Sequence, residues 1–305
     1  MSAGTAGTNP GITLHPLPAD GFDPRAASPL ELRRYGMPQR PDPAVRPNLA
    51  ALWDEVFSRK LSYITPTLQP VHEVLPGLTR PDRPRQAVTI DHPYWSGGVT
   101  HAQPGQKFGW VTGRWNVPDV TPPVSGAGNW YSFAWIGIDG TADVTQIGTI
   151  QSVSADSSGN LSKECYAVCE WWPQGWQTVS NFPVSFGDTV SGLICMLSTT
   201  EAEYSLVNIT AGVYTGFKLL TPTGSTVSAE NQAEWIFEHP GVPNESPQLP
   251  NFGEIYFDSA FGGYGLEFVA DGGPDTVLNM VENGITVATT TVETPSLIKI
   301  AYTGS

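Results

Sequence analysis

Residues 131–153 read Tyr-Ser-Phe-Ala-Trp-Ile-Gly-Ile-Asp-Gly-Thr-Ala-Asp-Val-Thr-Gln-Ile-Gly-Thr-Ile-Gln-Ser-Val. Two runs rich in aromatic and β-branched residues, 132–138 and 146–153, flank a polar stretch that contains glycine, which predicts two β-strands joined by a turn. From residue 88 onward the chain repeats this pattern in about fourteen short runs, with no long helical periodicity between them. We therefore expect an all-β fold, an antiparallel double-sheet β-sandwich of the concanavalin-like kind.

The first 85 residues have a different composition. They contain 14 of the 28 prolines, and two short helices are expected in them. Ser28-Pro29-Leu30-Glu31 is a capping box with proline at the first helical position, and residues 47–60 place apolar side chains on one helical face. That face has to pack on something, so we expect residues 1–85 to be an N-terminal extension with a linker, docked on a sandwich domain of residues 86–305.

The charge of the chain disfavours several classes of partner. The formal net charge is −14, and residues 86–305 carry 21 Asp and Glu against five Lys and Arg. Such a domain repels phosphate backbones, so nucleic-acid binding is disfavoured. No apolar run is long enough to span a bilayer, and residues 1–10 lack the features of a secretory signal. We expect a monomer that binds neither nucleic acid nor membrane.

Several catalytic motifs are absent from the sequence. It contains no Gly-x-Ser-x-Gly elbow of serine hydrolases, no His-Glu-x-x-His of zinc proteases, and no Asp-Thr-Gly or Asp-Ser-Gly of paired-aspartate proteases. The five histidines show no close metal-ligand spacing, so we expect no metal and no cofactor. What remains is a set of segments that place an acid or an amide beside a tryptophan or a glycine turn, namely residues 94–98, 134–140, 144–149, 169–173 and 231–236.

On a concave sheet, residues of this kind form a groove with aromatic walls and a few convergent polar groups. Taken together and in this order, the segments resemble the glutamic peptidases, or eqolisins, over roughly residues 90–305. The most specific motifs are Trp-Ile-Gly-Ile-Asp-Gly at residues 135–140 and Ala-Glu-Trp-Ile at residues 233–236. The resemblance implies an acid-acting endopeptidase with a double-sheet sandwich and a polypeptide substrate.

The resemblance also implies the residues of the site. The catalytic pair of the family, a glutamine and a glutamate, falls on Gln146 and Glu234. The spacing from Gly140 also admits Gln151, and we choose Gln146 because Ile-Gly-Thr follows it, matching the glycine that closely follows the family's glutamine. Substrate positioning is assigned to the neighbourhood of the pair, which comprises Trp95, Trp135, Asp139, Glu170 and Trp171.

Two of these assignments have alternatives. Adjacent residues of a strand point to opposite faces, so only one of Trp171 and Trp172 can line the groove, and the other belongs to the core. Asp139 is equally compatible with a structural role, in which its side chain holds the backbone of its own turn.

The residue types suit peptide hydrolysis. A carboxyl group such as that of Glu234 can act as the base toward water in one step and as the acid toward the leaving nitrogen in the next. The amide of Gln146 is uncharged at any relevant pH, so its N–H donors remain available in acid to stabilise an oxyanion.

Further alternatives concern the extension and the function. Residues 1–85 are either a prosegment, which covers an acidic groove at neutral pH and is released in acid, or a fixed extension that stabilises the sandwich.

The rival function is a non-enzymatic, lectin-like sandwich in which Trp171, Trp172 or Trp176 stacks on carbohydrate. A glycosidase built on Glu170 and Glu234 is less favoured because the expected carboxylate spacing along a strand is missing. An acid peptidase belongs outside the cytoplasm, so we expect secretion.

Overall fold

The computed structural model describes residues 11–70, 88–139, 144–172, 175–221, 231–240, 248–264 and 273–304. In these residues it contains two helices, α1 (Pro29–Arg34) and α2 (Pro47–Phe57), and eighteen strands. The strands are β1 (Ile12–Leu14), β2 (Ser62–Tyr63), β3 (Leu68–Pro70), β4 (Val88–His92), β5 (Trp95–His101), β6 (Phe108–Asn116), β7 (Gly128–Asp139), β8 (Val144–Ala155), β9 (Leu161–Trp171), β10 (Gln177–Val179), β11 (Thr189–Ser198), β12 (Glu201–Asn208), β13 (Val213–Leu220), β14 (Gln232–Glu238), β15 (Glu254–Tyr264), β16 (Thr276–Glu282), β17 (Ile285–Thr294) and β18 (Leu297–Tyr302).

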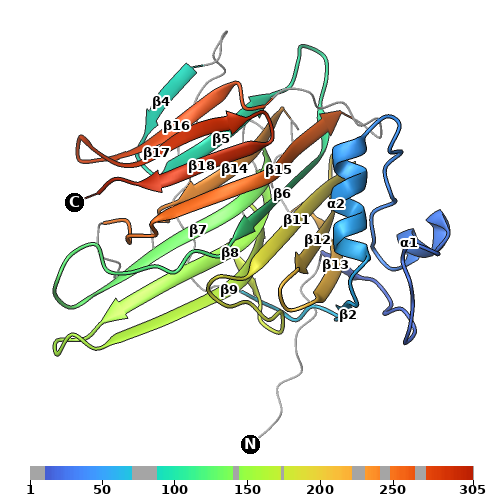
Figure 1. Cartoon of the computed structure of the whole chain (residues 1–305), viewed down its shortest axis with the longest axis horizontal. Helices are drawn as coiled ribbons and strands as arrows, with labels where there is room; N and C mark the ends of the chain where they lie inside the picture. The colour runs from blue at the N-terminus through green and yellow to red at the C-terminus, as the bar shows by residue number, and fades with distance from the viewer. Residues whose placement is uncertain are drawn as a thin grey trace, which may run out of the picture.

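The strands form two layers, which Figure 1 shows nearly face on. The first layer runs β3, β10, β9, β8, β7, β14, β5 and β16, and every neighbouring pair in it is antiparallel. The second layer runs β13, β12, β11, β6, β15, β18, β17 and β16, again antiparallel throughout. Residues 276–278 of β16 pair with β5 and residues 280–282 pair with β17, so this strand joins the layers. The expected antiparallel sandwich is confirmed.

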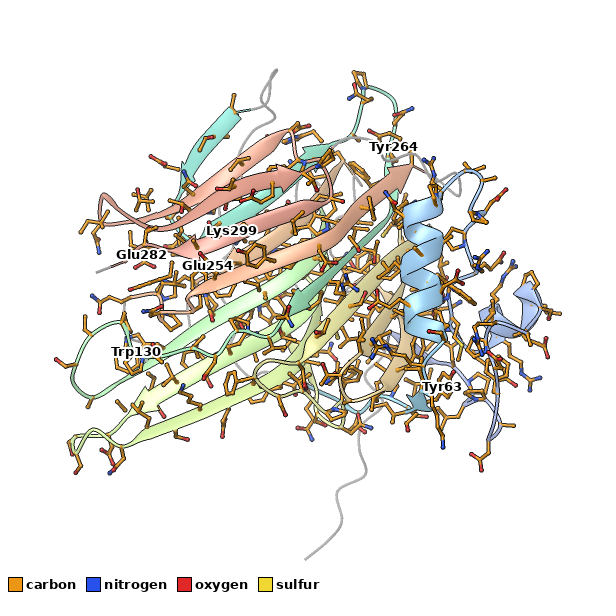
Figure 2. The ribbon with its side chains drawn as sticks, in the orientation of Figure 1. Tyr63, Trp130, Glu254, Tyr264, Glu282 and Lys299 are labelled. Atoms are coloured by element: carbon orange, nitrogen blue, oxygen red, sulfur yellow. The ribbon has the colours of Figure 1, made fainter. Side chains whose placement is uncertain are left out.

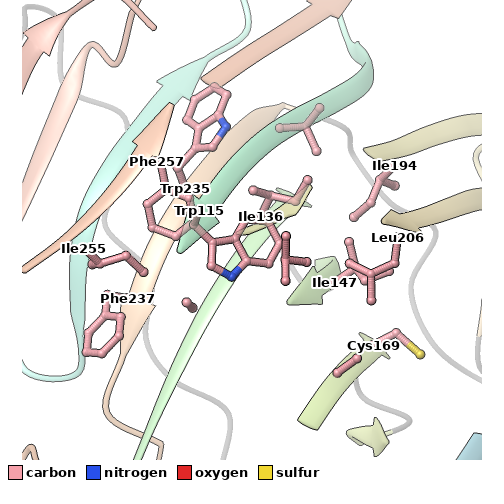
Figure 3. Close-up of a cluster of buried hydrophobic side chains, with 14 of the residues drawn as sticks. Trp115, Ile136, Ile147, Cys169, Ile194, Leu206, Trp235, Phe237, Ile255 and Phe257 are labelled. Carbon is pink, nitrogen blue, oxygen red and sulfur yellow. The ribbon is translucent and has the colours of Figure 1, made fainter. Parts of the chain in front are cut away.

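The core lies between the two layers and follows the alternation of the strands. Ala233, Trp235 and Phe237 of β14 all point into it and contact apolar side chains of the second layer. Figure 3 shows Trp235 beside Trp115 and Phe257, and Phe237 beside Ile255. Because a strand has a period of two, the intervening residues of β14 must point to the outer face of the first layer.

The N-terminal residues pack on the outer face of the second layer. Helix α1 begins with the expected capping box, in which Ser28 and Glu31 satisfy each other's backbone N–H groups. Helix α2 buries Trp53 and Phe57 against Tyr214, beside β12 and β13, as Figure 1 shows. Residues 71–85 of the expected linker lie outside the described residues.

Polar contacts reinforce this packing. The hydroxyl of Tyr214 donates a hydrogen bond to the carbonyl of Gly36. Arg114 of β6 forms ion pairs with Glu55 of α2 at 2.6 Å and with Asp258 of β15 at 2.7 Å. Tyr63, labelled in Figure 2 near the end of α2, lies edge-on to the Tyr214 ring. The described part of the extension is therefore attached through both apolar and polar contacts.

Neither α1 nor α2 is long and apolar enough to cross a membrane, and the described residues contain no other helix.

We expect the described part of the extension to unfold together with the sandwich. Phe57→Ala removes a buried ring at the interface and should lower the free energy of unfolding by about 3–5 kcal/mol, as measured by urea denaturation. Leu30→Ala is the control, because this side chain is 75% exposed and its loss should change the value by less than about 0.5 kcal/mol. An unchanged midpoint for Phe57→Ala would show that the extension does not belong to the cooperative unit.

Candidate active site

One row of residues crosses four strands of the first layer. In the strand pairing, Glu234 of β14 lies opposite Gly137 of β7, Gly137 lies opposite Gln146 of β8, and Gln146 lies opposite Glu170 of β9. Directly opposed residues of antiparallel strands point to the same face. Neighbouring strands are about 4.8 Å apart, so the backbones of Glu234 and Gln146 are separated by about 10 Å. Only a glycine stands between them.

This row lies on the outer face of the first layer. Residues 233 and 235 on β14 point into the core between the layers, so Glu234 points the other way. A second apolar cluster surrounds the row on that face, and its buried residues come from the first layer or from the segment between β9 and β10. Its buried members are Trp95, Val99, Phe133, Trp135, Ile150, Val168, Trp176, Ile236 and Leu278.

The polar side chains of the row are buried. Glu234 is 0% exposed, Glu170 is 2% exposed and Gln146 is 4% exposed. The Nε2 atom of Gln146 donates a hydrogen bond to Oε2 of Glu170. A carboxylate only accepts hydrogen bonds, so this contact determines which end of the Gln146 amide points toward β9. The second Nε2–H of the amide remains available for another acceptor.

Trp135 provides an apolar neighbour to the row. Its Nε1–H donates to Oε2 of Glu238 at 2.7 Å, and its ring meets that of Trp95 edge to face at 5.3 Å. Glu238 is itself buried, and it follows Glu234 by four residues on the same face of β14. The indole is therefore held by a hydrogen bond to the strand that carries Glu234.

Two glycines make room for Trp135. A Cβ atom at Gly148, directly opposite Trp135, would lie 2.1 Å from the carbonyl oxygen of Ala134 and 2.6 Å from Cβ of Trp135. A Cβ atom at Gly137 would lie 2.9 Å from the Trp135 ring. A larger residue at either position would clash with Trp135 or the backbone beside it, which explains sterically why glycine stands in the Trp-Ile-Gly and Gln-Ile-Gly motifs.

The structure brings together most of the side chains expected at the site. Gln146, Glu234, Glu170, Trp135 and Trp95 share the outer face of the first layer. Strand pairing places the backbone of Asp139 opposite Val144 and Gln232, while its side chain lies outside the described structure.

The expectation for Trp171 needs correction. This residue is 1% exposed and belongs to the cluster between the layers, because it follows Glu170 on the strand and so points to the opposite face. Trp171 is therefore a core residue and is not retained as a substrate contact.

The two candidate glutamines lie on opposite faces of β8. Gln151 is 0% exposed and faces the core, where its Nε2 donates to Thr149 Oγ1 at 2.7 Å. Ser132 Oγ donates to Gln151 Oε1 at 3.4 Å. Gln151 follows Gln146 by five positions, an odd offset along the strand, so only Gln146 shares the face of Glu234.

Sequence reasoning did not identify Glu238 or Gly137 as parts of this arrangement. The four-residue spacing from Glu234 was a usable signal for Glu238, since residues i and i+4 of a strand share a face. For Gly137 the signal was weaker, because only the strand pairing places it between the two catalytic candidates.

Within the described ranges, no group of three or more His, Cys, Asp or Glu side chains is placed to hold a metal ion.

An antiparallel sandwich with two glutamates and a glutamine buried in one row has the features of the glutamic peptidase class. A family model described as the Peptidase A4 family matches residues 93–302, and the chain belongs to this family. It is accordingly a glutamic endopeptidase, an enzyme that acts on polypeptides.

Individual relatives agree with this assignment. The chain is 26% identical to aspergillopepsin-2 of Aspergillus niger over 223 residues, which cover 67% of this chain and 75% of that protein. It is 28% identical to scytalidopepsin B of Scytalidium lignicola over 144 residues, which cover 47% of this chain and 50% of that protein. The crystal structure of scytalido-glutamic peptidase with a transition state analog inhibitor matches the fold with a TM-score of 0.55 at 22% identity, covering 69% of this chain and 98% of that chain.

A histidine–aspartate pair lies near the row, two residues along β5 from the position opposite Glu234. His101 of β5 is opposite Gln232, and its Nδ1 and backbone N contact the Asp275 carboxylate at 2.7 and 2.9 Å. Burial opposes ionisation of Asp275, but the hydrogen bonds from His101 and Thr276 and the charge of His101 together outweigh it and hold the pKa of this carboxyl below its usual value. A carboxyl with a lowered pKa stabilises the fold above its unfolded pKa, and this stabilisation is lost as the pH falls through the folded value.

We expect Asp275→Asn to lower the free energy of unfolding by about 1 kcal/mol near pH 5 and by less near pH 2, because protonation of the wild-type carboxyl as the pH falls removes this stabilisation. The value is small because the Asp275 side chain is 38% exposed. Urea denaturation at both pH values measures the difference, with Asp91→Asn on the exposed side of β4 as the control. An equal loss at both pH values would contradict an ionic origin.

Proposed function

We propose that the protein hydrolyses peptide bonds in acid with Glu234 and Gln146 as its catalytic pair. One observation carries the proposal, namely that the two side chains stand in one row on the same face, on either side of Gly137. A water molecule and the scissile carbonyl then bind between the carboxyl group of one strand and the amide of the other. The polypeptide substrate supplies the carbonyl.

The reaction proceeds in two steps. In the first, the Glu234 carboxylate takes a proton from water, the water oxygen bonds to the carbonyl carbon, and the π electrons of the C=O bond move to the carbonyl oxygen. The free Nε2–H of Gln146 donates a hydrogen bond to this oxyanion. In the second step, Glu234 returns the proton to the amide nitrogen, the C–N bond breaks, and the carbonyl re-forms.

The residue types of this pair are compatible with catalysis in acid. The Gln146 amide does not titrate, so its N–H donor is present at low pH. Glu170 accepts the other N–H and orients the amide. The few Lys and Arg residues of the sandwich limit positive self-repulsion once carboxylates are protonated.

The remaining groups of the site serve substrate positioning in this proposal. Trp95 and Trp135 provide an apolar wall beside the pair, and Asp139 lies on the same strand as Trp135, at its end.

We further propose a secreted monomer that binds neither nucleic acid nor membrane. The lectin-like alternative is not retained, because the chain belongs to a peptidase family and Trp171 lies in the core.

The catalytic pair is tested by single substitutions. Gln146→Ala removes one oxyanion donor and should lower kcat by about 10²–10³. Glu234→Gln removes the proton acceptor and should lower kcat by about 10²–10⁴. The measurement is cleavage of a denatured protein at acid pH, with circular dichroism to verify that each variant is folded.

Two further variants control this experiment. Glu254→Gln makes the same chemical change as Glu234→Gln at a surface ion pair with Lys299, labelled in Figure 2, and should leave kcat unchanged. Gln151→Leu tests the other glutamine, and should lower stability while kcat stays near the wild-type value, because Gln151 faces the core. Wild-type activity in both Gln146→Ala and Glu234→Gln would refute the assignment of the pair.

We also propose that residues 11–64 stay bound to the sandwich in the active enzyme. Their contacts are largely apolar, made by side chains such as Trp53 and Phe57, and apolar burial does not weaken when carboxylates are protonated. They cover the outer face of the second layer, whereas Glu234 lies on the outer face of the first. Release of these residues is therefore not needed to expose the catalytic pair.

Acid incubation tests this second proposal. The protein is held at the pH of maximal activity, separated by size-exclusion chromatography, and its N-termini are sequenced. We expect peptides from residues 11–64 to elute with the sandwich domain in the active fraction, whether or not the chain has been cut. An active fraction that lacks residues 11–64 would overturn the proposal.

A further inference from the structure

A buried tyrosine of the second layer reaches the strands that carry Gln146 and Glu170. Tyr204 lies on β12, is 0% exposed, and belongs to the cluster between the layers. Its ring stacks on Phe217 of β13 with the centroids 5.4 Å apart and the planes 2° from parallel. This stacking fixes the direction in which the hydroxyl crosses the core.

The Tyr204 hydroxyl makes two contacts on the first layer. It is hydrogen-bonded to the hydroxyl of Thr145 on β8, and it donates to the backbone carbonyl of Glu170 on β9 at 3.3 Å. Thr145 immediately precedes Gln146 and is itself fully buried, facing the core. One phenol therefore holds both strands at the positions from which Gln146 and Glu170 point to the opposite face.

We propose that Tyr204 is a positioning residue for catalysis, which sets the relative position of Gln146 and Glu170 from behind the sheet. The inference rests on the proposed catalytic role of Gln146. If the two strands shift against each other here, the hydrogen bond from Gln146 to Glu170 changes and the free N–H of the amide no longer points at the oxyanion. Small displacements of a catalytic group are costly, since about 1 Å can lower a rate 10²-fold.

The chemistry of the residue suits an enzyme that works in acid. Burial raises the pKa of Tyr204 well above its usual value of 10, so the phenol stays neutral over the whole working range. A hydroxyl in an apolar core is costly unless it is hydrogen-bonded, and phenylalanine has nearly the same shape. Packing alone would therefore be served by phenylalanine.

The chain offers a matched control. Tyr214 is also a buried tyrosine of the second layer, and its hydroxyl bonds to Ser205 Oγ at 2.9 Å and to the carbonyl of Gly36. These contacts lie on the far side of the second layer, toward the N-terminal extension. Tyr214→Phe therefore removes a buried hydroxyl without touching β8 or β9.

The experiment compares Tyr204→Phe with Tyr214→Phe in the full chain, measuring kcat and KM at acid pH and Tm by calorimetry. Both variants should have a lower Tm. Only Tyr204→Phe should lower kcat, by about tenfold with KM unchanged, because the oxyanion donor is displaced while substrate contacts are kept. Thr145→Val should also lower kcat, and adding it to Tyr204→Phe should lower kcat little further, because the hydroxyl that Thr145 contacts is then already absent.

The outcomes distinguish this inference from the proposed function. If Tyr204→Phe lowers Tm as Tyr214→Phe does but leaves kcat unchanged, Tyr204 has only a structural role and the inference is overturned. If Gln146→Ala retains wild-type activity, the proposed function fails independently of Tyr204. Additive effects of Tyr204→Phe and Thr145→Val on kcat would also overturn the inference.

Discussion

The pairing register of four neighbouring strands is the constraint on which the rest of the structure depends. In β14, β7, β8 and β9 it aligns Glu234, Gly137, Gln146 and Glu170 across the sheet. A slip of one residue in β14, β8 or β9 would turn its polar side chain into the core and turn core side chains to the outer face. Burial of large groups such as Trp235 between the layers therefore fixes the same register that assembles the site.

The site is buried, and the structure offsets the cost of that burial in specific ways. A polar side chain removed from water is costly unless it is hydrogen-bonded. The Gln146 amide bonds to Glu170, and Glu238 accepts the indole N–H of Trp135. These contacts hold the side chains in one arrangement, so a hydrogen-bond donor is already oriented before a substrate arrives. The two glycines beside Trp135 serve the same arrangement, because side chains there would displace the indole.

Much of the fold was predictable from local patterns. Alternating apolar residues and turn signals predicted the strands and the sandwich, and the capping box predicted the start of α1, because each depends on residues close in the chain. The assignment of Trp171 to the site failed because residues 171 and 172 were equally acceptable until the pairing with Thr145 defined the face. Glu238 was missed because its partner, Trp135, is 103 residues away in the sequence.

The sequence by itself determined the class of fold, the family, and the residue types available for catalysis, since these follow from periodicity and from motifs of a few residues. Only the tertiary structure decided which glutamine faces Glu234, that Trp171 is core, and that Tyr204 reaches behind the site from the other layer. The physical reason is that strand pairing and layer packing join residues far apart in the chain. Side-chain direction depends on that pairing, which no local pattern contains.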